Sequence, residues 1–449
     1  MQPDPAQRAG LLRRLRRHQG RPVVAGRGRP RQDLVTSTSG SSGSSTTAPS
    51  TPRTIVAWGF GAVLVLYAGL AQARIVPLLG EHPAGEDFAV YQRAGQAIWS
   101  GGDPYLTHEG FPFIYPPIAA WLFGPLALLS VPVGLALWSA VSALLTWWIT
   151  WRAGVRRSLL SAGIAAVVLL AAAPFTRTVS LGQLGVLLTA AALLDFGRPA
   201  GRPGGWWRGI ATGVASAVKL TPALFPVWAL LSRQRRVAMV AILTAMALTL
   251  VGLIASPGLT WDFAMGLLRG ETGIGDRANS ISNQSVGAAL RRLFGSSTAV
   301  SVLTVAVSLA AVVAALLAAR RWHQAGRELF AVCLVGVATL VVSPVSWVHH
   351  HIWVLPLAVV LILEGRGIGP ARWIGLAWAA WLAFFPPRLV PTDPEVWVYP
   401  WYLDLLGAVS VVLALALLVA ALLSTPRIPS PASSSPAGTS PTSEPPAVG

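Results

Sequence analysis

Residues 299–319 read AVSVLTVAVSLAAVVAALLAA, a run of 21 residues without a single charge. A helix rises 1.5 Å per residue, so about 20 apolar residues cross the hydrocarbon core of a membrane, and this run is predicted to do so. Comparable runs recur along the chain, at 54–74, 115–150, 158–173, 181–196, 209–231, 236–255, 328–343, 347–363, 372–386 and 402–423. The sequence therefore predicts an all-α, polytopic membrane protein.

The composition agrees with lipid as the solvent. Hydrophobic residues make up 53% of the chain and charged residues only 11%, which lies outside the range of soluble globular proteins. The net charge of +17 does not indicate a nucleic-acid partner, because most arginines occupy short gaps between apolar runs. Cys333 is the only cysteine, which excludes a disulfide framework and a thiolate metal site.

Both ends of the chain are predicted to be disordered cytoplasmic tails. Residues 1–53 are rich in Arg and end in a Ser/Thr-rich segment, and residues 424–449 are rich in Ser and Pro. Neither composition buries enough apolar surface to offset the entropy lost on ordering. A transmembrane domain over 54–423 remains between them.

Two apolar runs leave the number of spans open, and the distribution of charge decides it. The run 115–150 is too long for one crossing and is proline-rich in its first half, and 209–231 is interrupted by Lys219 and Pro222. If the first run crosses once and the second forms a two-helix hairpin, there are about twelve spans and both termini are cytoplasmic. The proline-rich half would then be partly embedded.

This arrangement satisfies the positive-inside rule in a plasma membrane. The five cytoplasmic loops hold 14 arginines, whereas the opposite face holds seven arginines and ten acidic residues. The two longest loops, 75–114 and 256–298, fall on the outer face, and long polar loops are where sites tend to lie. Five of the seven histidines also fall there, namely His82, His108, His349, His350 and His351.

The first outer loop carries the strongest candidate for chemistry. Apolar residues between Phe88 and Trp99 have the spacing of a short amphipathic helix, lying along the membrane surface or re-entering it. Asp87 would begin this helix beside Glu86, where an acidic residue is also simply a good helix cap. Asp103 lies in a Gly-Gly-Asp-Pro segment typical of a turn.

Lys219 is the only lysine of the chain and lies inside an apolar run. An ionisable group in that place is costly and indicates function, although a lysine that extends its ammonium to the membrane surface is an equal alternative. Arg177 and Gln183, in TRTVSLGQLG (176–185), would place a cation and an amide at the outer face or form an ordinary polar connection.

The histidines 349–351 lie at the predicted outer start of a span. Adjacent residues on a helix point about 100° apart, so a cage of three histidines around a metal ion is not expected. One or two of them would instead bond a phosphate or a sugar. Asn283, Gln284 and the following serine predict a cap and a short helix.

Five segments in this order and spacing resemble glycosyltransferase family 87. They are DFAVYQRAGQAIWSGGDPY (87–105), YPPIAAWLFGPLALL (115–129), SAVKLTPALFPVWALLSRQRR (216–236), NQSVGAALRRLFG (283–295) and SPVSWVHHHIWVLP (343–356). The resemblance implies an actinobacterial enzyme of the GT-C architecture. It would transfer mannose from polyprenyl-phosphate-mannose, in α-1,2 linkage, to a phosphatidylinositol mannoside or lipoglycan acceptor.

The resemblance also implies roles for single residues. The family's catalytic acid corresponds to Asp87, and its late histidine corresponds to His349 or His350. A base must take the acceptor proton and a leaving phosphate needs positive charge, so Asp87 is the expected general base and Lys219 and Arg177 are expected near the phosphate. A single carboxylate suits direct inverting displacement.

The remaining expectations are a set of contacts and partners. Membrane lipids and a glycolipid acceptor are the expected partners, no cofactor or metal ligand set is predicted, and metal dependence stays open. A transporter or flippase of a lipid-linked sugar is the alternative function, although it would typically show internal repeats. The expected contacts to the acceptor or its loop are Tyr91, Arg93, Asp103, Tyr105, Asn283 and Gln284.

Overall fold

The computed structural model describes residues 52–78, 84–106, 110–197, 205–271, 273–389 and 399–426. Most of both predicted tails and the two histidines His82 and His108 lie outside the described residues. The described part is helical and contains no strand, as the sequence predicts. The longest helices are α2 (Pro52–Leu78), α5 (Val131–Arg152), α11 (Arg235–Ala255), α14 (Thr298–Gln324) and α18 (Trp401–Leu423).

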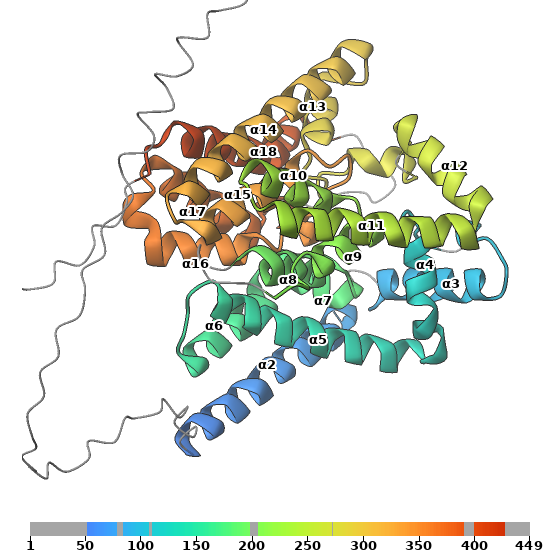
Figure 1. The fold of residues 1–449 in the computed structure, drawn as a ribbon, viewed down its shortest axis with the longest axis horizontal. Coiled ribbons are helices and arrows are strands. Elements are labelled where there is room, and N and C mark those ends of the chain that lie inside the picture. The colour runs from blue at the N-terminus through green and yellow to red at the C-terminus, as the bar shows by residue number, and fades with distance from the viewer. Residues whose placement is uncertain are drawn as a thin grey trace, which may run out of the picture. The chain divides into compact units, whose positions relative to one another are not determined.

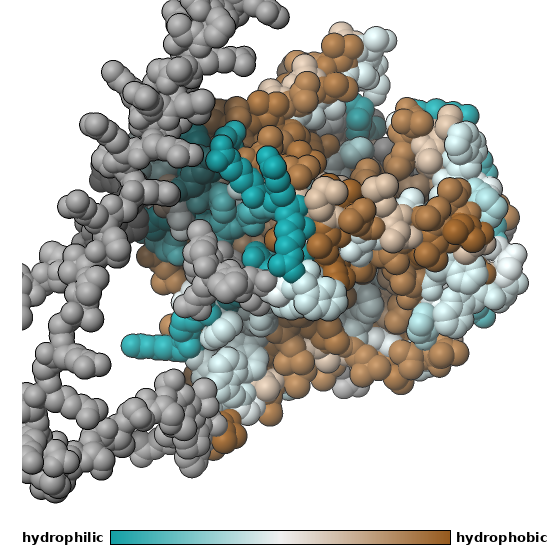
Figure 2. Space-filling model, in the orientation of Figure 1, coloured by the Kyte–Doolittle hydropathy of each residue, from teal (hydrophilic) through white to brown (hydrophobic). Residues whose placement is uncertain are grey.

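These five helices are long and apolar enough to cross a membrane. A sixth crossing is possible if α6 (Ser158–Ala171) and α7 (Ala173–Leu181), which meet at an angle of 76°, count as one broken span. Figure 2 shows hydrophobic side chains over much of the visible face, along α5, α11 and α14, while hydrophilic side chains gather to the left of α11. The exposed apolar surface is what lipid would cover.

The prediction of twelve spans is not confirmed, because several apolar runs form short helices. A helix of 12 residues is about 18 Å long, well below the roughly 30 Å of a hydrocarbon core. Run 115–150 forms two short elements followed by one long helix, α5, as expected of a run that crosses once. The short helices are α8 (Gly185–Phe196), α9 (Ile210–Val218), α10 (Leu224–Leu231), α15 (Glu328–Val341), α16 (Val354–Glu364) and α17 (Pro370–Phe384).

Hydrogen bonds bring the arginine-rich loops to one end of the helix bundle. The Asp195 carboxylate at the end of α8 accepts the backbone N–H of Thr212 in the first turn of α9, at 2.7 Å. Arg327 pairs with Glu364 at 3.3 Å, which joins the start of α15 to the end of α16. Trp322, near the end of α14, bonds the carbonyl of Ala421 at the end of α18. Arg152 bonds the carbonyl of Gly197, and the Gln234 amide lies 3.4 Å from the Glu328 carboxylate. The described flanks of the five arginine-rich loops therefore lie together.

Helices α9 and α10 form a hairpin that starts and ends at this same end. A Cβ on Gly209 or Gly213 would touch the first half of α11, so α9 runs alongside that half. Helix α9 then stops, the backbone of Lys219 becomes extended, and α10 leads back to the start of α11. Lys219 therefore lies at the tip of the hairpin, about 13 Å up a bundle whose long helices exceed 30 Å.

The opposite end carries α3 (Glu86–Trp99), α4 (Pro117–Phe123), the short 3-10 helix η1 (Gly124–Leu128) and α12 (Pro257–Leu268), on the right of Figure 1. The predicted amphipathic helix forms as α3, but most of its apolar face packs on protein rather than on a membrane. A Cβ on Gly95 would lie 2.7 Å from the backbone of Phe123, so α3 and α4 are in close contact. Of the apolar residues that form this face, only Trp99, 49% exposed, remains at the surface.

Candidate active site

The site begins where α7 ends and the chain turns toward α8. Gly182 ends α7 with a φ of +74°, a left-handed conformation that favours glycine. A Cβ on Gly182 would lie 2.6 Å from the Cβ of Phe88, so the turn packs directly on α3. The backbone N–H of Gly85 also bonds the carbonyl of Ser180 at 2.7 Å. These contacts place the next residue, Gln183, beside the first turn of α3.

Asp87 lies in that first turn and accepts a hydrogen bond from the Gln183 side-chain amide. Burial raises the pKa of the Asp87 carboxyl from 3.8 to about 6, and the neighbouring Glu86 adds to the rise. The hydrogen bond from Gln183 and the positive charges of Lys219 and Arg177 oppose it. The carboxylate is therefore mostly ionised at neutral pH and is still basic enough to accept a proton.

Two buried tyrosines continue the network away from Asp87. The hydroxyl of Tyr91 donates to Oε1 of Gln183 at 3.0 Å and lies 3.1 Å from the hydroxyl of Tyr115. The Tyr91 side chain is 1% exposed and stacks on Phe123. Tyr91 was predicted to contact an acceptor, and the structure places it underneath Asp87, within the protein.

Lys219 and His350 meet at the other side of the network. Nζ of Lys219 lies 3.2 Å from Nε2 of His350 and 5.3 Å from the ring centre of Tyr115. Nδ1 of His350 accepts the backbone N–H of Trp347 at 3.2 Å, which assigns the ring proton of a neutral His350 to Nε2. An ammonium and an N–H then lie next to each other, and an anion placed beside both could accept a hydrogen bond from each.

The three histidines have different surroundings, so the structure separates them. His351 is fully buried, bonds the carbonyl of Trp347 and packs on Trp378. His349 directs its carbonyl to the hydroxyl of Thr178 at 2.6 Å. Of the three, it is His350 whose ring nitrogen lies 3.2 Å from Nζ of Lys219, which favours His350 as the family histidine.

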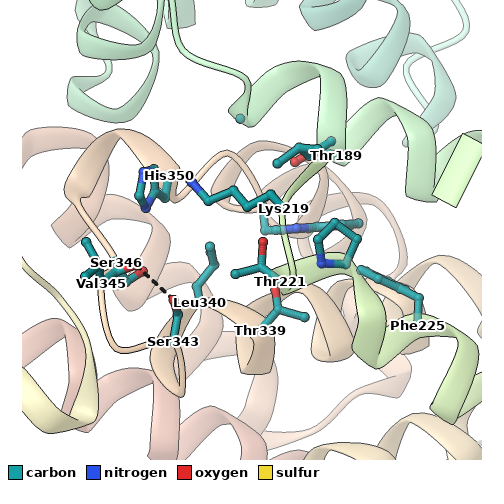
Figure 3. A pocket seen from close by; sticks show the side chains of 14 residues that line it. Thr189, Lys219, Thr221, Phe225, Thr339, Leu340, Ser343, Val345, Ser346 and His350 are labelled. Atoms are coloured by element: carbon teal, nitrogen blue, oxygen red, sulfur yellow. Dashed lines mark hydrogen bonds between the residues drawn. The ribbon is translucent and has the colours of Figure 1, made fainter. Parts of the chain in front are cut away.

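A pocket opens beside this pair, and Figure 3 shows Lys219 pointing across it toward His350. Hydroxyl-bearing side chains from α8, the hairpin and the end of α15 line it together with apolar groups. Mixed hydroxyl and apolar walls next to two cationic or N–H donors suit a phosphate that carries a sugar and a lipid chain. The labelled hydroxyl residues of this pocket are Thr189, Thr221, Thr339, Ser343 and Ser346.

The other predicted residues lie around this centre in supporting positions. Oδ1 of Asp103 accepts the backbone N–H of Tyr105 at 2.8 Å, which is the turn role expected of an Asp-Pro segment. The Tyr105 hydroxyl donates to the Tyr115 carbonyl at 2.7 Å. Arg93 lies on α3 beside Gly110, and the positive charge of Arg177 reaches Asp87 from α7.

Asn283 and Gln284 are fully buried and hold backbone rather than facing the pocket. Oδ1 of Asn283 accepts the backbone N–H of Ser346 at 2.9 Å, and its amide bonds the carbonyl of Ala278 at 2.8 Å. The Gln284 amide bonds the carbonyl of Ile281 at 2.6 Å. Through these bonds the segment at 283 supports the loop that leads to His350.

Sequence reasoning left two central residues out of its candidate site. Gln183 was noted only as an amide at the outer face, and Tyr115 only as the first residue of an apolar run and of a family-like segment. No local pattern marked either residue, because their roles depend on contacts between segments that are far apart in the sequence. Within the described residues, no three His, Cys, Asp or Glu side chains group as metal ligands.

Comparison with known proteins gives matches over most of the chain. The family model for glycosyltransferase family 87 matches residues 113–344. A polyprenol-phosphate-mannose-dependent alpha-(1-2)-phosphatidylinositol mannoside mannosyltransferase of Mycobacterium tuberculosis is 33% identical over 386 residues, covering 80% of this chain and 89% of the relative. The protein of the same description from Mycolicibacterium smegmatis is 31% identical, covering 72% and 80%.

A related pentamannoside mannosyltransferase of Mycobacterium tuberculosis is 34% identical over 327 residues, covering 68% of this chain and 72% of the relative. No solved structure gives a significant match.

Proposed function

The chain belongs to glycosyltransferase family 87, and from that premise we propose that it transfers mannose from polyprenyl-phosphate-mannose to a hydroxyl of a phosphatidylinositol mannoside or related lipoglycan. The family resemblance noted in the sequence is thereby confirmed. Donor, α-1,2 linkage and acceptor class are those in the descriptions of the mycobacterial relatives. The match gives no support to the alternative of a transporter or flippase.

One observation carries the chemical proposal: a single carboxylate and a Lys–His pair lie at the two sides of one buried network. Asp87 interacts electrostatically with Lys219, and Lys219 contacts His350 at 3.2 Å. A base and a cationic anion site at one centre are the two requirements of transfer from a lipid phosphate.

The proposed reaction is a direct displacement. The acceptor hydroxyl oxygen attacks C1 of the mannose as its proton passes to Asp87, and the bond between C1 and the phosphate oxygen breaks. The electron pair of that bond leaves with the polyprenyl phosphate, whose added charge is stabilised by Lys219 and by the N–H of His350. Attack from the face opposite to the leaving group inverts the configuration at C1.

The proposed topology follows from charge. The end of the bundle that gathers the arginine-rich loops faces the cytoplasm, together with both termini, and the end with α3 and α4 faces outward. The site then lies on the extracytoplasmic side of the plasma membrane, where both lipid substrates reach it from the bilayer.

Purified protein in detergent or vesicles, supplied with radiolabelled polyprenyl-phosphate-mannose and phosphatidylinositol mannosides, tests the proposal. We expect label to move to a larger glycolipid in an α-1,2 linkage, identified by digestion with a linkage-specific mannosidase. A second arm offers lipid-linked arabinofuranose. Absence of transfer from the mannose donor by protein that is folded, or preference for the other sugar, would overturn the assignment of the donor.

A further inference from the structure

The hydrogen bonds between Tyr115 and Asp87 have a single possible direction. The Gln183 amide nitrogen donates to Asp87, so its Oε1 faces Tyr91 and can only accept. The Tyr91 hydroxyl therefore donates its one hydrogen to Gln183. In the 3.1 Å contact between the two tyrosine hydroxyls, Tyr115 must then be the donor.

The Asp87 carboxylate fixes the orientation of the amide, because an ionised carboxylate can only accept a hydrogen bond. If the Gln183 side chain flipped, its oxygen would face the carboxylate and that hydrogen bond would be lost. Tyr91 itself has little freedom, because its ring stacks on Phe123 at 4.8 Å and meets the edge of Tyr115 at 5.5 Å. The two tyrosines thus hold the amide, and the amide holds Oδ2 of Asp87.

We propose that Tyr115, Tyr91 and Gln183 form a directional relay that positions Asp87 as the base, by occupying Oδ2 and leaving Oδ1 for the acceptor hydroxyl. The inference rests on the proposed function, since it assigns positioning residues to that same site. Hydrogen bonds in such a chain polarise one another, so the loss of a distant member weakens the bond to the carboxylate.

The relay acts beside other charges that influence the same carboxylate. Glu86 lies next to Asp87 on α3, Arg177 reaches it from α7, and Lys219 reaches it from the tip of the hairpin. Gln183→Ala and Tyr91→Phe leave these three charged residues in place and remove only neutral hydrogen-bonding groups.

The test uses near-isosteric variants of the full-length protein. Gln183→Glu replaces the donor by an acid, and Gln183→Ala removes it. Tyr91→Phe removes one hydroxyl that is buried within the protein. Tyr67→Phe is the matched control, because Tyr67 is 71% exposed on α2. Thermal unfolding identifies variants that do not fold, and Tyr91→Phe keeps the ring contacts if either Gln183 variant fails.

Two measurements test the relay, and the first of them does not depend on the proposed enzymatic activity. The first is the Asp87 carboxyl band in infrared difference spectra against Asp87→Asn, followed with pH and without substrate. We expect its midpoint to rise by about one pH unit in Gln183→Ala, because a bond to the charged form is lost, and by less in Tyr91→Phe. The second is the pH dependence of kcat, whose acid limb should move in the same order with the donor KM unchanged.

An unchanged infrared midpoint in both Gln183→Ala and Tyr91→Phe would overturn the relay, even if Asp87→Asn is inactive. Full activity of Asp87→Asn would instead remove the base from the proposed mechanism, while the infrared titration still decides whether the relay acts on the carboxyl. A shift in Tyr67→Phe as large as in Tyr91→Phe would also contradict the proposal.

Discussion

Nζ of Lys219 lies 3.2 Å from Nε2 of His350, although 131 positions separate the two residues in the sequence. We expect Lys219→Ala to lower turnover and donor affinity more than Lys219→Arg, because arginine keeps a positive charge near the leaving phosphate. Rates and donor binding measured on both purified variants check this. Full activity of a well-folded Lys219→Ala protein would show that the lysine only extends its ammonium toward water and has no part in the reaction.

Asp87→Asn keeps the size of the side chain but cannot take the acceptor proton. General-base catalysis contributes roughly 10²- to 10⁴-fold, so turnover should fall by that factor while donor binding persists. Glycolipid formation and donor binding measured together give the answer.

Asp103→Asn is the control, because an asparagine Oδ1 can still accept the Tyr105 N–H. Near-normal turnover of Asp87→Asn would move the base elsewhere, with Glu86 as the first candidate.

The dependence of turnover on pH should have an acid limb near the pKa of Asp87, which burial raises to about 6. Below that pH the carboxyl holds its proton and cannot act as a base, so kcat rises with pH through about 6 and then levels off. A profile of kcat at saturating substrates measures this. A limb near pH 4, the ordinary range of an exposed carboxyl, would contradict the buried environment.

Gly182→Ala should lower stability and activity together. The left-handed backbone costs a non-glycine residue about 1–3 kcal/mol, and the added Cβ would meet Phe88 at 2.6 Å. Thermal unfolding and turnover check the effect. Gly163→Ala on α6 is the matched control, since a Cβ there meets nothing within 4 Å and should leave stability equal or higher.

Single cysteines test which end of the bundle faces outward. In a Cys333→Ala background, an impermeant thiol reagent applied to intact cells should label Ser100→Cys, at the end of α3, and spare Arg156→Cys, between α5 and α6. Both positions are exposed on the protein. Labelling of the second alone would invert the proposed topology.

The sequence predicted the helical class and the family, because apolar runs and the order of motifs are local signals. Asp87, Lys219 and His349 or His350 were chosen from the same signals, and their roles stay predictions. The number of spans could not be predicted in the same way, because hydrophobicity does not reveal that a run such as 181–196 forms only the 12 residues of α8. Gln183 was not among the candidates because its role depends on a contact with Asp87 on α3, 96 positions earlier in the sequence. Contacts of that range have no signature in a single sequence.

The contact between the tip of the α9–α10 hairpin and His350 can form only late in synthesis. The ribosome adds Lys219 well before His350, so the growing chain contains the lysine before the histidine that contacts it. Chains that stop before residue 350 contain Asp87, Gln183 and Lys219 but lack the histidine that lies 3.2 Å from the lysine.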